Sequence, residues 1–232
     1  GVRSVSVQDF YETVMSDLAY YMDLNASTGG TSDGKQTLAT WKSELERLNM
    51  DFATIVDHRQ SLHMYLEDWD NAIFIGGSEA ATRIKDRTGV FLHYNMIFAD
   101  PAGLEAVVSA FPEFNYRQWT EEDRAGTGGQ WHFDYPAFSA ERFSEVCEAV
   151  YENGGFVSLV HPKADGYIDS ENPADAYFRE GTAIEVFYTY HRSLSSWIIQ
   201  KNYKLWTDML KAGCFQRLLD VQCFDLDAVE SI

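Results

Sequence analysis

The chain has 232 residues, a length at which one domain is expected and which α/β barrels commonly occupy. Its formal net charge of −18 at pH 7 opposes contact with polyphosphate backbones and excludes bulk nucleic-acid binding. Hydrophobic residues make up 45% of the chain, yet no apolar run approaches the ~18 residues of a membrane span. We therefore expect one soluble domain over 1–232, with neither nucleic-acid nor membrane partners.

The number and spacing of the cysteines indicate the redox state of the compartment in which the protein acts. Cys147, Cys214 and Cys223 show no C-x-x-C spacing, and their odd number favours free thiols. No secretory signal is visible at the amino end, although a leader removed before Gly1 is compatible with the sequence. These observations favour a reducing compartment, and we expect a cytoplasmic protein.

Apolar runs bounded by turn residues alternate along the chain with segments of helical spacing. Strands are predicted at 20–24, 52–56, 72–75, 90–98, 156–160, 183–188 and 217–223. Helices are predicted at 8–18, 37–49, 101–111, 139–153 and 195–212. Ser139 is the expected N-cap of the fourth helix, and Gly76 and Gly77 are expected to close the third strand. Residues 112–138 are irregular, a loop long enough to have a function or to act as a lid.

The alternation of strands and helices favours a parallel sheet, either doubly wound or closed into a barrel. Polar residues stand at or just after the ends of five of the predicted strands. They are Asp57 with His58, Glu79, His93, His161 and Asp225. In a parallel barrel the carboxyl ends of all strands open on one face, so these side chains are expected to converge there.

The stretch 23–34 reads Asp-Leu-Asn-Ala-Ser-Thr-Gly-Gly-Thr-Ser-Asp-Gly and follows the first predicted strand. It resembles the opening motif of the PHP (polymerase and histidinol phosphatase) family of metal-dependent phosphoesterases, Asp-Leu-His-x-His-(Ser/Thr) followed by Ser-Asp-Gly. Asn25 and Ser27 stand where that motif has its two histidines. An amide oxygen and a neutral hydroxyl are weaker ligands than imidazole for zinc, iron or manganese, so one arm of the implied metal site is degenerate.

Later segments resemble the family's other motifs in the same order. The run 52–58 is similar to its apolar strand ending in Thr-Asp-His, and 76–79 is similar to its Gly-x-Glu motif, whose carboxylate bridges metals. His93 and His161 match the next two ligand motifs. The resemblance covers nearly the whole chain and is greatest to the bacterial branch that includes carbamate-insecticide hydrolases. It implies a distorted seven-stranded (βα)7 TIM-like barrel, the PHP fold, with the site at the carboxyl ends of the strands.

The last family motif, Ser-Asp-x-His, is damaged in this chain. Its aspartate matches Asp225, just after the last predicted strand, or Asp220 within that strand, and we favour Asp225. Asp227 then replaces the final histidine. The resemblance implies one site for a divalent zinc, manganese or iron ion, with its occupancy put in question by the lost histidines. The implied metal ligands are His58, Glu79, His93, His161 and Asp225.

Two functions are compatible with this pattern. The first is a PHP-like hydrolase of the phosphoesterase type, with weak or altered activity, that acts through a metal-activated water on a small anionic or ester substrate. Asp57 and His58 are then the candidate catalytic residues, and the candidate substrate-binding residues beside the motifs are Arg59, Arg83 and Lys163. The alternative is a non-catalytic descendant that binds a small anionic ligand or a protein partner.

Overall fold

The computed structural model describes residues 22–26, 36–85, 91–117, 135–160, 182–185 and 195–211. Within these ranges it is a mixed α/β structure with one sheet, which confirms the expected α/β class. The predicted helix at 8–18 and the predicted last strand at 217–223 lie outside the described residues.

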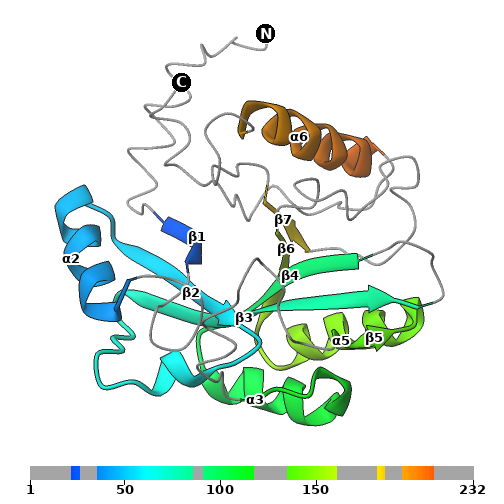
Figure 1. Cartoon of the computed structure of the whole chain (residues 1–232), viewed down its shortest axis with the longest axis horizontal. Helices are drawn as coiled ribbons and strands as arrows, with labels where there is room; N and C mark the ends of the chain where they lie inside the picture. The colour runs from blue at the N-terminus through cyan, green and yellow to red at the C-terminus, as the bar shows by residue number, and fades with distance from the viewer. Residues whose placement is uncertain are drawn as a thin grey trace, which may run out of the picture.

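Seven strands form the described part of the sheet (Figure 1). They are β1 (Met22–Ala26), β2 (Phe52–His58), β3 (Phe74–Ile84), β4 (Phe91–Phe98), β5 (Ala137–Phe138), β6 (Phe156–Leu159) and β7 (Ala183–Ile184). Their order is β1-β2-β3-β4-β6-β7, and β5 pairs with β3. Strand β4 runs antiparallel to both β3 and β6, whereas the remaining pairs are parallel. The prediction of an all-parallel sheet is therefore wrong for β4, and no pairing between β1 and β7 closes a barrel within the described strands.

The third strand is longer than predicted because the glycine pair lies inside it. A Cβ at Gly77 would lie 2.3 Å from the carbonyl oxygen of Met96 on β4, and one at Gly76 would lie 2.1 Å from Cε of Met64. Both glycines thus allow close approach of neighbouring atoms within a continuous strand. As a result, Glu79 lies in the middle of β3 and not after its end.

The helices cover one face of the sheet with their apolar sides. They are α2 (Leu38–Leu48), α3 (Pro101–Ala110), α5 (Ala140–Glu152) and α6 (Ser195–Lys211), with short 3-10 turns η1 (Leu62–Tyr65) and η2 (Pro112–Phe114). Ser139 caps α5 as predicted, since its Oγ accepts the Arg142 amide at 3.0 Å. None of the described helices is long and apolar enough to cross a membrane.

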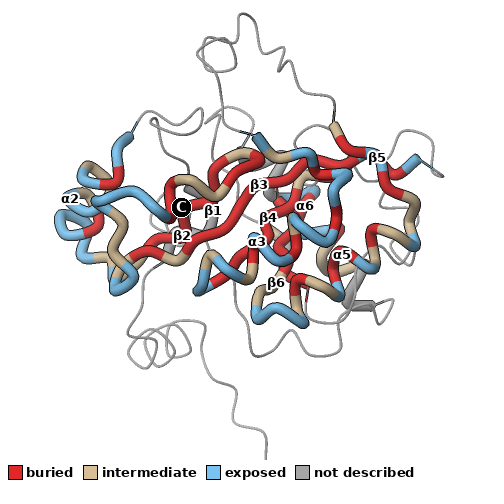
Figure 2. The backbone as a smooth tube through the Cα atoms, turned by 90° about the horizontal axis from the view of Figure 1, so that it is seen from below, coloured by how far each residue is buried: buried red, intermediate tan, exposed pale blue. Residues whose placement is uncertain are grey.

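Strand alternation divides the sheet into two chemically different faces. Tyr94, Met96 and Phe98 of β4 are fully or almost fully buried in the main core together with residues of α3 and α5. Figure 2 shows most of the central strands in the colour of buried residues. A second apolar cluster joins α2 to β2 through Leu45 and Ile55. The odd-numbered residues of β3 and β4 point to the opposite face, and it is this face that carries the candidate site.

The glycine pair generates a stability prediction. Gly77→Ala should lower the free energy of unfolding by about 1–3 kcal/mol, because its Cβ would collide with the main-chain oxygen of Met96. Gly76→Ala should lower it less, because its Cβ would meet the flexible end of the Met64 side chain. Urea denaturation of both variants and the parent measures the difference. A Gly76→Ala loss equal to or larger than that of Gly77→Ala would contradict this account.

Candidate functional site

Three strands bring His58, Glu79 and His93 together on one face of the sheet. In the parallel register of β2 and β3, His58 pairs with Glu79. In the antiparallel register of β3 and β4, Glu79 pairs with Asn95 and Ala81 with His93, so His93 lies diagonally across from Glu79. The His58 Nδ1 lies 3.8 Å from one Glu79 carboxylate oxygen, and the His93 Nδ1 lies 3.4 Å from the other.

The direction of β4 explains how His93 reaches this cluster. Because β4 is antiparallel to β3, the beginning of β4 lies beside the later part of β3. His93 is the third residue of β4 and therefore faces Glu79 without standing at the carboxyl end of any strand. We predicted that both residues belong to the site on the assumption that all strands run in one direction. In the structure the two residues are neighbours because β4 runs antiparallel to β3.

The cluster is buried around its carboxylate and more open at its imidazoles. The Glu79 side chain is 8% exposed, and those of His93 and His58 are 17% and 27% exposed. A carboxylate at this depth needs nearby protons, donors or cations to offset the loss of water. The imidazoles of His58 and His93 are the neighbouring groups that can offset this lost hydration. His58 is the most exposed of the three side chains.

The donor set suits a divalent metal in its chemistry. Imidazole nitrogen and carboxylate oxygen are ligands of zinc, and two ligands held at about 2.1 Å from one ion lie roughly 3–4 Å apart. Each Glu79 oxygen lies at such a distance from a different imidazole. Among the residues that the structure describes, no group of three or more His, Cys, Asp or Glu side chains is gathered to hold one ion. Further ligands would therefore have to come from other parts of the chain.

Several of the predicted site residues cannot be placed. Ser27, His161, Lys163, Asp225 and Asp227 lie outside the described residues. The backbone of Asn25 is described as part of β1, which pairs with β2. Their proposed roles stay predictions.

Asp57 lies on the other face of the sheet from His58. Its Oδ2 is 3.3 Å from Nδ1 of His63, a residue of η1, and both side chains are 0% exposed. The His63 Nε2 lies 3.0 Å from the carbonyl oxygen of Ile55, so this nitrogen carries a proton and donates it. The structure thus does not bring Asp57 to the Glu79 cluster and instead joins it to a histidine that no sequence motif marked.

The two candidate substrate-binding arginines have different environments. Arg59 follows β2 with a left-handed φ of 54° and is 7% exposed, and its Nη2 donates to the Phe114 carbonyl oxygen at 3.3 Å. Arg83 is exposed on the same face as Glu79, and its Cζ lies 5.7 Å from the centre of the Phe91 ring. Arg83 is therefore the more available of the two for a ligand, and Arg59 is largely committed to the fold.

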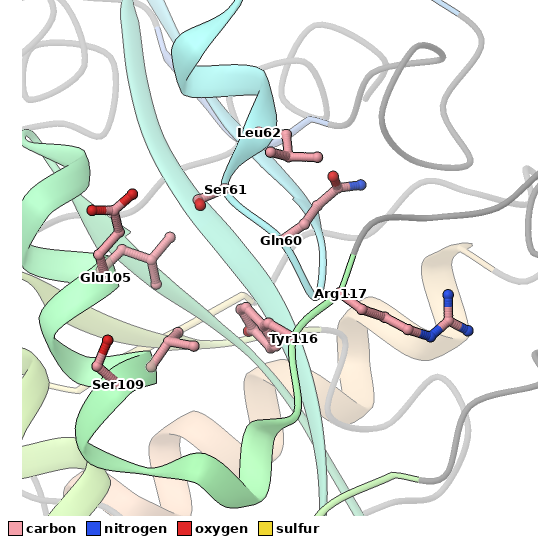
Figure 3. A pocket seen from close by; sticks show the side chains of 9 residues that line it. Gln60, Ser61, Leu62, Glu105, Ser109, Tyr116 and Arg117 are labelled. Atoms are coloured by element: carbon pink, nitrogen blue, oxygen red, sulfur yellow. The ribbon is translucent and has the colours of Figure 1, made fainter.

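A pocket of about 370 Å³ lies on the helix-covered side of the sheet (Figure 3). Glu105 and Ser109 of α3 line one side of it, and Tyr116 and Arg117 line the other. The Tyr116 hydroxyl lies 2.9 Å from Oγ of Ser78, whose side chain points away from that of its neighbour Glu79. This pocket is therefore separate from the face that carries the Glu79 cluster.

No protein-family model matches the chain, and no similar curated protein is found. Among solved structures, a candidate metal-dependent phosphoesterase from Bifidobacterium adolescentis is 14% identical with a TM-score of 0.42, over 80% of this chain and 85% of that one. An amidohydrolase from Chromobacterium violaceum, with bound sulfate and no metal, is 16% identical with a TM-score of 0.49, over 78% and 80% of the two chains. Similarity at this level assigns neither a family nor an activity.

The buried Asp57–His63 contact generates a second prediction. His63→Ala should lower the free energy of unfolding by about 3–5 kcal/mol, because it removes a partner from a fully buried carboxyl group. Asp57→Asn should lower it less, because the amide can still hydrogen-bond to Nδ1 of His63. Chemical denaturation of the two single variants and of the double variant measures the coupling. Strictly additive losses would show that the two side chains do not interact.

Proposed function

We propose that this chain is a metal-dependent hydrolase of the PHP type. The observation that carries the proposal is Glu79, a buried carboxylate with one imidazole at each of its two oxygens. His58, Glu79 and His93 would hold the metal, together with His161 and Asp225 from outside the described residues. A divalent ion bound there would supply Lewis acidity and a water of lowered pKa for hydrolysis.

The family motifs support a finer version of this proposal. The chain would belong to the bacterial branch resembling carbamate-insecticide hydrolases, and its sheet would close into a distorted (βα)7 barrel through segments beyond the described strands. The β1–β2–β3 arrangement is compatible with such a barrel, because these strands are parallel and their register places His58 beside Glu79. The protein would act in the cytoplasm on a small anionic ester or related substrate.

The chain's own residues have distinct roles in this proposal. Glu79 lies beside the Nδ1 atoms of both imidazoles and would share the metal with them, and His58, the most exposed of the three side chains, is the member of the cluster best placed to meet a substrate. Asp57 acts from behind the strand, where its contact with His63 anchors the end of β2 that carries His58. Hydrolysis would be weaker than in an intact family member, because Asn25, Ser27 and Asp227 replace imidazole ligands.

The same replacements favour a second candidate function. A PHP-derived domain that has lost part of its metal site could keep the scaffold and bind a small anionic ligand or a protein partner without catalysis. The residues at positions 25, 27 and 227 are the specific observation behind this alternative. Metal binding and turnover distinguish the two functions.

Substitution of the central carboxylate tests the hydrolase directly. Glu79→Gln should weaken zinc and manganese binding by at least the roughly 10–100-fold that follows the loss of a residue supporting a ligand, because it removes a proposed ligand that faces both imidazoles. Calorimetric titration of chelator-treated protein measures this, alongside hydrolysis of p-nitrophenyl phosphate and p-nitrophenyl acetate with added metal. Glu46→Gln, an exposed change on α2, is the matched control and should behave like the parent. Metal binding without turnover would favour the non-catalytic alternative, and unaltered binding by Glu79→Gln would refute the metal site.

Restoring the lost ligands is a complementary test. The double change Asn25→His and Ser27→His should raise metal affinity, because it returns imidazoles to the positions where the family motif has them. The gain depends on neighbouring groups that can orient the new rings, whose absence typically lowers affinity by about 10–100-fold. Calorimetry on the parent and the double variant compares them. Equal affinities in a folded variant would mean that these two positions do not face the site.

A further inference from the structure

Among the described strands, the edge of β3 that faces β2 has a break next to Glu79, between the pairing with β2 and the pairing with β5. Strand β4 occupies the other edge of β3 from Gly76 to Arg83. Strand β2 pairs with the first edge only as far as Glu79, and β5 joins that same edge at Arg83. The two limits are marked by main-chain hydrogen bonds, from Arg59 to the Glu79 carbonyl at 2.9 Å and from Arg83 to the Pro136 carbonyl at 3.0 Å.

Tyr135 lies two residues before the start of β5, close to this break. Its ring centre lies 5.9 Å from Cζ of Arg59, at the end of β2, and 4.9 Å from the Phe91 ring in an edge-to-face contact. The Phe91 ring in turn lies 5.0 Å from that of His93 and carries the Arg83 guanidinium at 5.7 Å. Tyr135 is therefore linked through Phe91 to the Glu79 cluster, although in the sequence it lies within the irregular stretch 112–138.

Two guanidinium groups and one carboxylate act on the Tyr135 hydroxyl. Burial raises the pKa of Tyr135 above its ordinary value, while Arg59 and Arg83 act in the opposite direction and Glu79 adds to the increase. The hydroxyl thus remains a hydrogen-bond donor, and the Arg59 guanidinium lies 5.9 Å from the centre of its ring. A neutral hydroxyl donor close to guanidinium groups is suited to an oxyanion.

We propose that Tyr135 and Arg83 recognise an oxyanion group of the substrate, phosphoryl or carboxylate, beside the Glu79 cluster. The proposal rests on the proposed hydrolase function for the statement that the bound anion belongs to a substrate. Tyr135 donates its hydroxyl, and exposed Arg83 supplies the charge from the Phe91 ring. Arg59 is a positioning residue, because its guanidinium donates to the Phe114 carbonyl oxygen and also lies 5.9 Å from the centre of the Tyr135 ring.

Anion binding in the absence of metal tests this. Tyr135→Phe keeps the ring contacts and removes only the hydroxyl, so it should weaken binding by about tenfold, as expected for a lost hydrogen bond to a charged group. Arg83→Gln should weaken binding at least as much. Calorimetric titrations with inorganic phosphate and with acetate, both in chelator, measure the affinities and show which oxyanion is preferred. Tyr65→Phe, which removes a hydroxyl of η1 that donates to Glu105 of α3, should equal the parent.

The outcomes are separable from those of the metal experiment. Equal affinities of the parent and Tyr135→Phe for the preferred anion would overturn the proposal, as would a parent protein that binds neither anion. Loss of binding in Tyr135→Phe and Arg83→Gln, with Tyr65→Phe unchanged, would support it whether or not metal binds. Because the anion titrations contain no metal, a failed zinc or manganese titration refutes the hydrolase and leaves the oxyanion site to be judged on its own data.

Discussion

The Glu79 carboxylate, buried between two imidazoles, is the constraint on which the site depends. A carboxylate with 8% exposure is compatible with folding only where neighbouring groups offset its lost hydration. Strands β2 and β4 bring that compensation from opposite sides of β3, one by parallel and one by antiparallel pairing. Gly77 contributes by allowing β4 to approach closely. Gly77 and Glu79 of β3 thus serve close packing and the candidate site within three residues of one strand.

The alternation of side chains along each strand places the candidate site and the main core on opposite faces of the sheet. Even-numbered residues of β3 and β4 fill the core beneath α3 and α5, while odd-numbered ones carry Glu79, Arg83, Phe91 and His93 on the other face. On β2 the alternation separates two adjacent polar residues, with His58 at the site and Asp57 sealed against His63. A pair of neighbours in sequence therefore has two unrelated environments, and only one of them can meet a substrate.

Sequence reasoning identified the α/β class and three residues that the structure brings together, because polar side chains in or after apolar runs are visible without coordinates. It did not predict the reversed direction of β4, since a buried strand has the same apolar pattern in either direction. It took Gly76 and Gly77 as a strand end, because the need for close approach is a tertiary property. No motif marked Tyr135 as a candidate site residue. Its contact with Arg59 depends on where β2 ends and β5 begins, which is a property of the tertiary structure.

The break in the β3 edge also has a consequence for local motion. Glu79 and Arg83 direct main-chain groups toward this edge, and by alternation the amide of Ala81 faces it as well. A main-chain amide beside such a break opens to solvent more readily than amides inside a continuous ladder, so hydrogen exchange should be faster at Ala81 than at its even-numbered neighbours. The floor of the site could then adjust to a bound molecule without disturbing the core that α3 and α5 form on the far side of the same strand.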